Sequence, residues 1–344
     1  MFSQRRLGVA LFFLLLSLQY VVCLVDPISL TIGAGVGLGA WFGGFGVLKD
    51  QTYCRWSECC NERSIKRDIG ELRRTLTEKL YGQHIVIQQL ISALEAHLNP
   101  HSSSRKPLVM SFHGTPGTGK NYVADMIAEA LYEKGVNSRF IHKYRGRLDF
   151  SIDNDVNKYN YRIYSDVTKG INDCPLSLFI FDEVDKMPQG VFESLTSLVD
   201  YNGLPDNLSG SKAIFIFISN TAGVQISHQL AKMLKNGAMR ENIKLSAFEQ
   251  VLEKVSYNIE GGLKKAGLIE KHVIDHYLPF LPLEKQHVLK CIAAEFKKWG
   301  RNPKEGVIES LLQDVITYDR EHGLFATSGC KTIEKKVATE VWIN

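Results

Sequence analysis

The sequence lacks a dominant charge of either sign. Its 344 residues contain 41 lysines and arginines against 37 aspartates and glutamates, which gives a formal net charge of +4. A nucleic-acid-binding protein usually gathers basic side chains into a patch or run, and here both signs are mixed along the chain. The composition therefore gives no indication of nucleic acid as a partner. The length suffices for one large domain and a smaller one.

Charge is missing altogether from residues 29–48, which also contain seven glycines. The segment is long enough to cross a bilayer, because a helical span takes about 20 apolar residues. Each interior glycine, however, costs a helix about 0.8–1 kcal/mol relative to alanine. A hairpin, or a segment embedded in one leaflet, therefore fits the composition as well as a single span does. We predict that residues 24–48 associate with a membrane.

The first 23 residues have the pattern of a secretory signal peptide. Arg5 and Arg6 precede an apolar run at residues 7–18, and residues 21–23 are compatible with cleavage. The alternative, a retained membrane anchor, is less favoured because the apolar run is short. The mature chain is thus expected in an oxidising compartment, where Asn207 of the Asn-Leu-Ser triplet is a candidate glycosylation site.

Six cysteines remain after such a signal peptide. An even number in an oxidising compartment predicts disulfides, and buried free thiols are the alternative. The sequence alone does not determine the pairing. Three of the six lie in residues 49–65, which we interpret as a linker. The six are Cys54, Cys59, Cys60, Cys174, Cys291 and Cys330.

A glycine-rich loop stands between an apolar segment and an amphipathic one. Residues 108–112 predict a short buried strand, and residues 122–134 place apolar side chains at helical spacing. In this context the loop's N–H groups and the helix N-terminus bind phosphate, and the lysine reaches the β- and γ-phosphates. We therefore predict nucleotide binding by the loop. Its residues are Gly114, Thr115, Pro116, Gly117, Thr118, Gly119, Lys120 and Asn121.

The loop departs from the usual pattern at its last position. Asn121 stands where a Ser or Thr hydroxyl normally ligates Mg²⁺. An amide oxygen can still ligate a hard cation or hold its water. We expect Asn121 to take part in binding Mg²⁺ and hydrolysis to be slow or assisted.

Two further apolar runs end in polar side chains. Residues 178–181 are followed by Asp182 and Glu183, and residues 213–218 are followed by Ser219 and Asn220. The carboxyl ends of parallel strands form the edge where open α/β sheets bind ligands. We expect Asp182 to hold Mg²⁺ through water, Glu183 to deprotonate the attacking water, and Asn220 to orient it.

The order of loop, acidic pair and asparagine resembles the AAA+ ATPases. Over almost its whole length the chain resembles one group of them, the torsins, which are Clp-related ATPases of the endoplasmic reticulum lumen and nuclear envelope. The resemblance implies an α/β fold: a three-layer α/β/α large domain with a parallel sheet at 66–281 and a small, mainly helical domain at 282–344. Two prolines in residues 278–282 mark the boundary. The residues that carry the resemblance are 114–121, 180–187, Ser219-Asn220, 280–284 and Gly329-Cys330-Lys331.

The resemblance assigns roles to residues outside the loop. With ATP and Mg²⁺ as cofactors, it implies that Lys331 delivers positive charge to the γ-phosphate. It also implies that Gly82 and Gln83 lie beside the adenine, with a plain helix break as the alternative. Cys291 is expected to pair with Cys330, and Cys54 with Cys174. Because Cys330 adjoins Lys331, we hypothesise that opening its disulfide changes nucleotide affinity.

Two features of ring translocases are missing from the sequence. No aromatic-Val-Gly pore loop is evident in residues 140–173, although Tyr144 precedes Arg145-Gly146. Arg240 is the only arginine where such a ring places the finger that points at its neighbour's nucleotide, and its surroundings do not match the usual pattern. We predict that Arg240 is a surface or helix-end residue. Torsins are similar in lacking a working finger and borrowing one from a membrane-anchored partner.

These observations predict a torsin-like ATPase of the endoplasmic reticulum lumen and perinuclear space. It is expected to lie on the lumenal membrane leaflet, to be weak alone, and to depend on a single-pass, lamina-associated type of activator with a lumenal domain. Its role would be that of a chaperone or remodeller, working as a homo-oligomer or a mixed ring or filament. The alternatives are a nucleotide-gated, filament-forming, membrane-shaping protein and a self-sufficient Clp-like unfoldase.

Overall fold

The computed structural model of the protein describes residues 54, 56–101, 106–151, 155–200, 212–258, 263, 273–303, 306–319 and 323–343. The chain divides into two compact units, Met1–Cys59 and Cys60–Asn344. The predicted signal peptide, the glycine-rich segment 24–48 and Asn207 lie outside the described residues. Among the residues that are described, no helix has both the length and the apolar character to cross a membrane.

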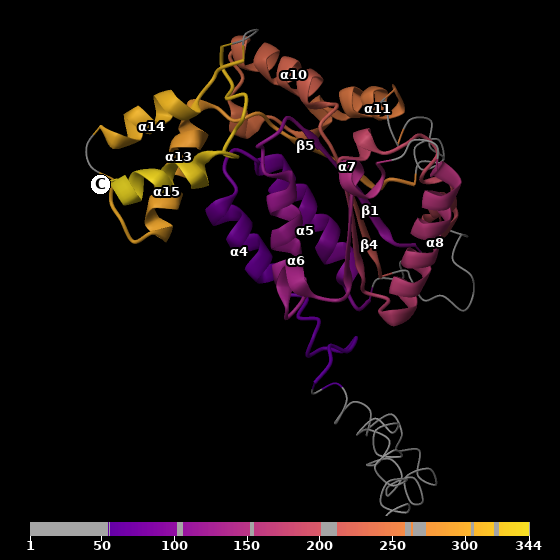
Figure 1. Ribbon diagram of the computed structural model, residues 1–344. Helices are drawn as coiled ribbons and strands as arrows, with labels where there is room; N and C mark the ends of the chain where they lie inside the picture. Colours follow the sequence, from indigo (N-terminus) through magenta and orange to yellow (C-terminus); the bar gives the residue numbers. More distant parts are fainter. Residues whose placement is uncertain are drawn as a thin grey trace, which may run out of the picture. The chain divides into compact units, whose positions relative to one another are not determined.

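Five parallel strands form one sheet within the second unit, in the order β2-β3-β4-β1-β5 (Figure 1). The two apolar runs and the segment before the glycine loop form β3, β4 and β1, as their composition predicts. Their order places β4 between β3 and β1, so the carboxyl ends of these three strands lie next to one another. The strands are β1 (Leu108–Gly114), β2 (Ile141–Arg145), β3 (Leu178–Asp182), β4 (Ile214–Ser219) and β5 (His276–Phe280).

The segment with two prolines begins inside a strand, which contains the first of them, Pro279. His276–Phe280 is β5 and pairs in parallel with β1, with Phe112 opposite Leu278. Proline lacks the N–H that a central strand needs, but β5 is at the edge of the sheet and has only one neighbour. The domain boundary at these prolines stays a prediction.

Helices cover both faces of this sheet (Figure 1). Side chains alternate along each strand, so that Phe112 and Ile216 join one buried cluster while Phe181 and Phe217 join another. The first cluster includes α4, α5 and α6, and the second includes α8 and α9. The predicted three-layer α/β/α arrangement is confirmed. The covering helices are α4 (Ile69–Lys79), α5 (His84–Leu98), α6 (Lys120–Leu131), α8 (Val156–Asp173) and α9 (Glu193–Val199). The same part of the chain also contains α7 (Gly146–Asp149), α10 (Gly223–Lys235) and α11 (Glu249–Asn258).

A row of stacked aromatic rings crosses strands β2, β3 and β4. Tyr144 stacks on Phe181 with ring centroids 4.7 Å apart, and Phe181 stacks on Phe217 at 5.1 Å. Such cross-strand aromatic pairs stabilise the register of neighbouring strands. Tyr144 is buried in this row, so it is part of the core and does not form a gripping pore loop.

The C-terminal region is mainly helical, as predicted. Its three helices enclose a core of their own, with Ile292 of the first, Leu311 of the second and Val337 of the third among its buried residues. In Figure 1 these helices form a group beside the sheet and its layers. They are α13 (Lys285–Lys298), α14 (Val307–Val315) and α15 (Ile333–Ile343).

The disulfides differ in part from those expected. Cys291 pairs with Cys330, as predicted. The predicted Cys54–Cys174 bond is wrong, because Cys60 pairs with Cys174, and Cys54 pairs with Cys59.

The backbone next to Cys60 explains this pairing. Ile65 forms an antiparallel bridge with Tyr132, and the Tyr132 hydroxyl donates a hydrogen bond to the carbonyl of Leu176 at 2.5 Å. These contacts hold the start of the second unit against the end of α8, where Cys174 is the C-cap. Cys60 therefore lies within disulfide distance of Cys174, with Cα atoms 5.3 Å apart.

Replacing Cys60 by Ser is expected to free Cys174 and to lower the free energy of unfolding by about 2–5 kcal/mol. Cys59→Ser is the matched control, since it alters the adjacent cysteine and should leave Cys174 linked. The measurements are the mass of the Cys174 peptide with and without reductant, and denaturant unfolding. A Cys174 link that survives Cys60→Ser and disappears in Cys54→Ser would contradict the observed pairing.

Candidate nucleotide-binding site

The glycine loop connects the end of β1 to the start of α6. Gly119 caps the helix in the left-handed conformation, with φ of 103°. Gly117 also has a positive φ, and a Cβ added there would lie 1.9 Å from the carbonyl oxygen of Ser328. The amide of Cys330 donates a hydrogen bond to the Gly117 carbonyl at 3.2 Å. The Gly-Cys-Lys segment therefore packs directly on the loop, in a gap that admits no side chain.

The Lys120 ammonium is buried inside the loop. It donates hydrogen bonds to the carbonyls of Gly114 at 2.7 Å and Thr115 at 2.9 Å. Burial lowers the pKa of Lys120 to about 8; the carboxylate of Asp182 opposes this shift, and the charge of Lys331 adds to it. A cation in a glycine-rich loop that leads into a helix N-terminus is an arrangement suited to a polyphosphate.

Two oxygen-bearing side chains meet beside the loop. The Asn121 amide nitrogen donates to an Asp182 carboxylate oxygen at 2.8 Å, so the two expected metal-side residues are neighbours. The other carboxylate oxygen of Asp182 accepts a hydrogen bond from the amide of Glu183 at 2.9 Å. Mg²⁺ usually takes one or two protein oxygens together with phosphate oxygens and water. Asn121 and Asp182 fit that chemistry.

Glu183 follows the end of β3 in a strained backbone conformation. Its φ is 54°, in the left-handed region that costs a residue with a side chain about 1–3 kcal/mol. Gly146 makes the turn possible, because a Cβ there would lie 2.3 Å from the Glu183 carbonyl oxygen. The carboxylate of Glu183 lies 3.7 Å from the Nε of Arg147, which is the cation beside it. Strain of this kind is typical of functional positions.

Asn220 follows β4, between the acidic strand and the strand that leads into the loop. The buried carboxylate of Asp185 accepts hydrogen bonds from the backbone N–H of Asn220 at 3.3 Å and from the Ser219 hydroxyl at 3.5 Å. Asp185 thus connects the turn after β3 to the end of β4. We did not predict a role for it, although its place two residues after Glu183 was a usable signal.

Gln83, which follows Gly82, lies against the phosphate loop. The side-chain amide of Gln83 donates to the carbonyls of Thr118 at 3.1 Å and Leu281 at 2.8 Å, and its oxygen accepts from the Leu281 amide. Both amide hydrogens of Gln83 are therefore used within the protein. A place beside the adenine stays a prediction for these two residues.

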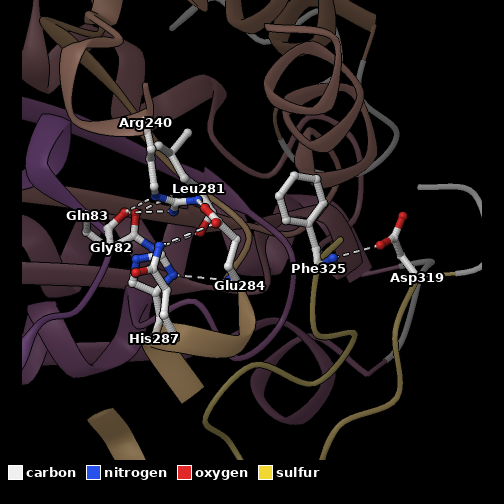
Figure 2. Close-up of polar contacts among 9 residues, drawn as sticks. Gly82, Gln83, Arg240, Leu281, Glu284, His287, Asp319 and Phe325 are labelled. Atoms are coloured by element: carbon white, nitrogen blue, oxygen red, sulfur yellow. Dashed lines mark hydrogen bonds and ion pairs between the residues drawn. The ribbon is translucent and has the colours of Figure 1, made fainter. Parts of the chain in front are cut away.

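Of the two places predicted for Arg240, the surface is wrong and the helix end is confirmed, because Arg240 begins the 3-10 helix Arg240–Asn242 and is buried. Its side chain is only 3% exposed and forms an ion pair with Glu284 at 2.8 Å. Its Nη2 also donates to the Gly82 carbonyl at 2.8 Å. Figure 2 shows this guanidinium enclosed by Gly82, Glu284 and His287. Sequence reasoning missed the burial because both partners are distant in the chain.

The fold also occurs in two solved structures. The S. cerevisiae Hsp104-ADP complex matches with a TM-score of 0.56 and 18% identity, and a closed state of Hsp104 with ATPγS and FITC casein matches with 0.55 and 16%. Each match covers 81% of this chain and 47% of the other, so the chain spans about half the length of the Hsp104 chain. At these identities the likeness concerns the fold alone. The parallel sheet, its phosphate loop and the helical C-terminal region together define the fold of the AAA+ class.

Two family models match the sequence: Torsin at residues 54–181, and Torsin-1A, C-terminal domain, at residues 283–339. A Torsin-like protein of Drosophila melanogaster is 52% identical over 322 residues, which are 92% of this chain and 93% of the relative. A Torsin-like protein of Caenorhabditis elegans is 33% identical over 335 residues, 95% of this chain and 94% of the relative. The chain belongs to the torsin family, so the resemblance seen in the sequence is confirmed.

Replacing Gly117 by Ala is expected to lower ATP affinity by about tenfold or more, because the new Cβ collides with the backbone of Ser328. Gly237→Ala is the matched control. Gly237 has a similar positive φ of 86°, but a Cβ there meets nothing within 4 Å. Both variants carry the same conformational penalty, and only the first should change affinity in a titration with a fluorescent ATP analogue. Equal affinities would contradict the role given to this contact.

The affinity for ATP is expected to fall as the pH rises above about 8. Below that pH Lys120 is cationic, and above it the buried ammonium loses its proton before ATP binds. Because polyphosphate favours the charged form, binding at pH 9 should take up a proton at Lys120. Calorimetry in two buffers of different ionisation enthalpy measures this uptake. An affinity that is constant from pH 7 to 9.5, without proton uptake, would show that Lys120 stays charged.

Proposed function

We propose that this torsin-family ATPase binds ATP and Mg²⁺ in the loop 114–121 and hydrolyses ATP only weakly without a partner. The single observation that carries the proposal is the convergence of Lys120, Asp182 and Asn220 at one edge of the sheet, beside the loop and Lys331. The family of AAA+ ATPases supports nucleotide hydrolysis in general. The rest is inferred from the chemistry of the side chains.

The protein's own residues divide the work of hydrolysis. Lys120 and Lys331 neutralise phosphate charge, and Asn121 and Asp182 would hold Mg²⁺, which supplies further positive charge at the phosphates when bound. Glu183 accepts a proton from the attacking water while the oxygen of that water forms a bond to the γ-phosphorus. The bond between the γ-phosphorus and the oxygen that bridges to the β-phosphate breaks, and ADP leaves with that oxygen. Asn220 orients the same water.

We infer that the missing component is an arginine supplied by a partner. Arg240 is enclosed within its own chain and paired with Glu284, which supports a partner as the source of the finger. A single-pass membrane activator with a lumenal domain, of the lamina-associated type, would provide it. The protein would act as a chaperone or remodeller, in a ring or filament with copies of itself or with the activator.

The proposed location is the lumen of the endoplasmic reticulum and the perinuclear space. Residues 1–23 have signal-peptide character and residues 24–48 are suited to the lumenal leaflet. Three disulfides in the structure favour an oxidising compartment. The membrane association would be peripheral, through the glycine-rich segment.

Addition of a purified activator lumenal domain is expected to raise ATP turnover of the protein, since an arginine finger contributes about 10³–10⁵ in rate. Glu183→Gln should bind ATP and activator normally yet stay inactive, because an amide cannot accept the proton of the water. The measurements are phosphate release and ATP binding for both proteins. Turnover that the activator leaves unchanged would contradict the proposal. Assembly that ATP controls equally well in Glu183→Gln would favour a nucleotide-gated scaffold.

A further inference from the structure

Arg240 and Glu284 form a buried ion pair where the sheet meets the C-terminal helices. Among the described residues it is the most deeply buried ion pair at this junction. Their side chains are 3% and 25% exposed, and the Nη1–Oε1 distance is 2.8 Å. Burial lowers the pKa of Arg240, and the carboxylate of Glu284 opposes the shift. A charge removed from water is tolerated only when its partners satisfy it, so these partners are required for the observed structure.

Two further nitrogens of the guanidinium donate to a single carbonyl. Nε and Nη2 of Arg240 donate to the Gly82 oxygen at 3.3 and 2.8 Å. Gly82 has a φ of 71°, and a Cβ on it would lie 2.9 Å from the His287 ring and 3.1 Å from Nη2 of Arg240. The turn between α4 and α5 is therefore packed tightly against both residues (Figure 2). A planar fork that holds a carboxylate and a carbonyl together fixes their relative position.

The two partners of Arg240, Gly82 and Glu284, are connected to different parts of the site. Gln83, next to Gly82, bonds to Thr118 of the phosphate loop and to Leu281 after β5. Glu284 is the N-cap of α13, and its amide donates to Nδ1 of His287 at 3.1 Å. That bond requires a neutral imidazole, because Nδ1 is the acceptor. Burial lowers the pKa of His287 to about 3, and the charges of Arg240 and Lys290 add to this shift.

Helix α13 is joined to the phosphate loop a second time. Cys291 in α13 is bonded to Cys330, whose amide donates to the Gly117 carbonyl. One series of contacts therefore connects α13 to Thr118 through Arg240 and Gln83. A second route connects α13 to Gly117 through the disulfide. Both routes end on adjacent residues of the same loop.

We propose that Arg240 is a positioning residue for the nucleotide of its own subunit, because it clamps the N-terminus of α13 to the Gly82–Gln83 turn and so to the phosphate loop. This inference rests on the proposed function only in placing ATP at that loop. Loss of the clamp removes one of the two described connections between α13 and the phosphate loop. Helix α13 holds the Gly-Cys-Lys segment, with Lys331, through the other connection, the Cys291–Cys330 disulfide, so the position of that segment on Gly117 becomes less fixed. The expected consequence is weaker ATP binding within one chain, whereas loss of an arginine finger would affect a neighbouring subunit.

The experiment compares ATP affinity in the full mature chain with Arg240→Ala, with Arg240→Lys, and with a matched control, Lys106→Ala. Lys106 is equally buried, pairs with Asp275 at 2.7 Å and donates to the Val273 carbonyl, but it stands before β1, at the end away from the phosphate loop. Thermal unfolding should show comparable destabilisation for the two alanine variants. A fluorescent ATP analogue should bind about tenfold or more weakly to both Arg240 variants and within about twofold of normal to Lys106→Ala.

A mixing experiment separates action within the subunit from action on a neighbour. Arg240→Ala protein is titrated with ATP analogue in the presence of excess Lys120→Ala protein, which retains Arg240 and lacks the loop cation. Affinity that stays low supports the clamp, and affinity restored by the added subunits would overturn it in favour of a finger. Normal affinity in Arg240→Ala would also overturn it, and Arg240→Lys takes its place in both measurements if the alanine variant does not fold. Failure of the unmodified protein to bind ATP would instead overturn the proposed function, and this inference with it.

Discussion

The backbone of Ser328 and Gly329 lies so close to Gly117 that neither side of the contact has room for a Cβ. A Cβ on Gly117 would approach the Ser328 carbonyl to 1.9 Å, and one on Gly329 would approach the Gly117 carbonyl to 2.3 Å. Such a contact places a segment from the far end of the chain on the phosphate loop without any side chain between them. The proposed position of Lys331 next to the phosphates depends on this contact, and so do the roles proposed for the C-terminal helices at the site.

This close approach requires support from elsewhere, because a backbone contact alone stabilises little. The Cys330 amide contributes one hydrogen bond to Gly117, worth about 0.5–1.5 kcal/mol. The larger contributions come from packing: Phe325, just before the segment, is buried in a cluster with Ile85 and Leu281. The Asp319 carboxylate also accepts the Phe325 amide at 2.9 Å, as Figure 2 shows beside the clamp. The segment that contacts Gly117 is thus held in place mainly by apolar packing of the residues that precede it.

The parts of the site that were predictable from the sequence are those with a local signal. The loop lies between a strand and a helix whose periodicities are plain, and Asp182 and Asn220 stand directly after buried runs. Their meeting at one edge follows from the rule that parallel strands end together. The fold class was predictable for the same reason, together with the family resemblance.

Other features depend on contacts between distant segments, which no local pattern encodes. β5 contains Pro279, and only its place at the edge of the sheet makes that residue acceptable. In the sequence Arg240 has no local sign of burial. Its partners Gly82 and Glu284 are more than forty positions away in either direction, and they surround it only in the folded chain. Cys60, and not Cys54, forms the disulfide with Cys174, because the bridge between Ile65 and Tyr132 places Cys60 next to Cys174.

The two long-range disulfides are placed so that they affect the protein differently. The Cys60–Cys174 bond closes a longer loop, with a sequence separation of 114 against 39 for Cys291–Cys330. In the chain-entropy model this difference makes the first bond more stabilising by about 1 kcal/mol. It also lies at the amino ends of the strands, away from the nucleotide edge. Opening Cys291–Cys330 is therefore expected to cost less stability, yet it releases a segment that contacts Gly117. We accordingly expect a change of redox conditions to affect the site before it affects the fold.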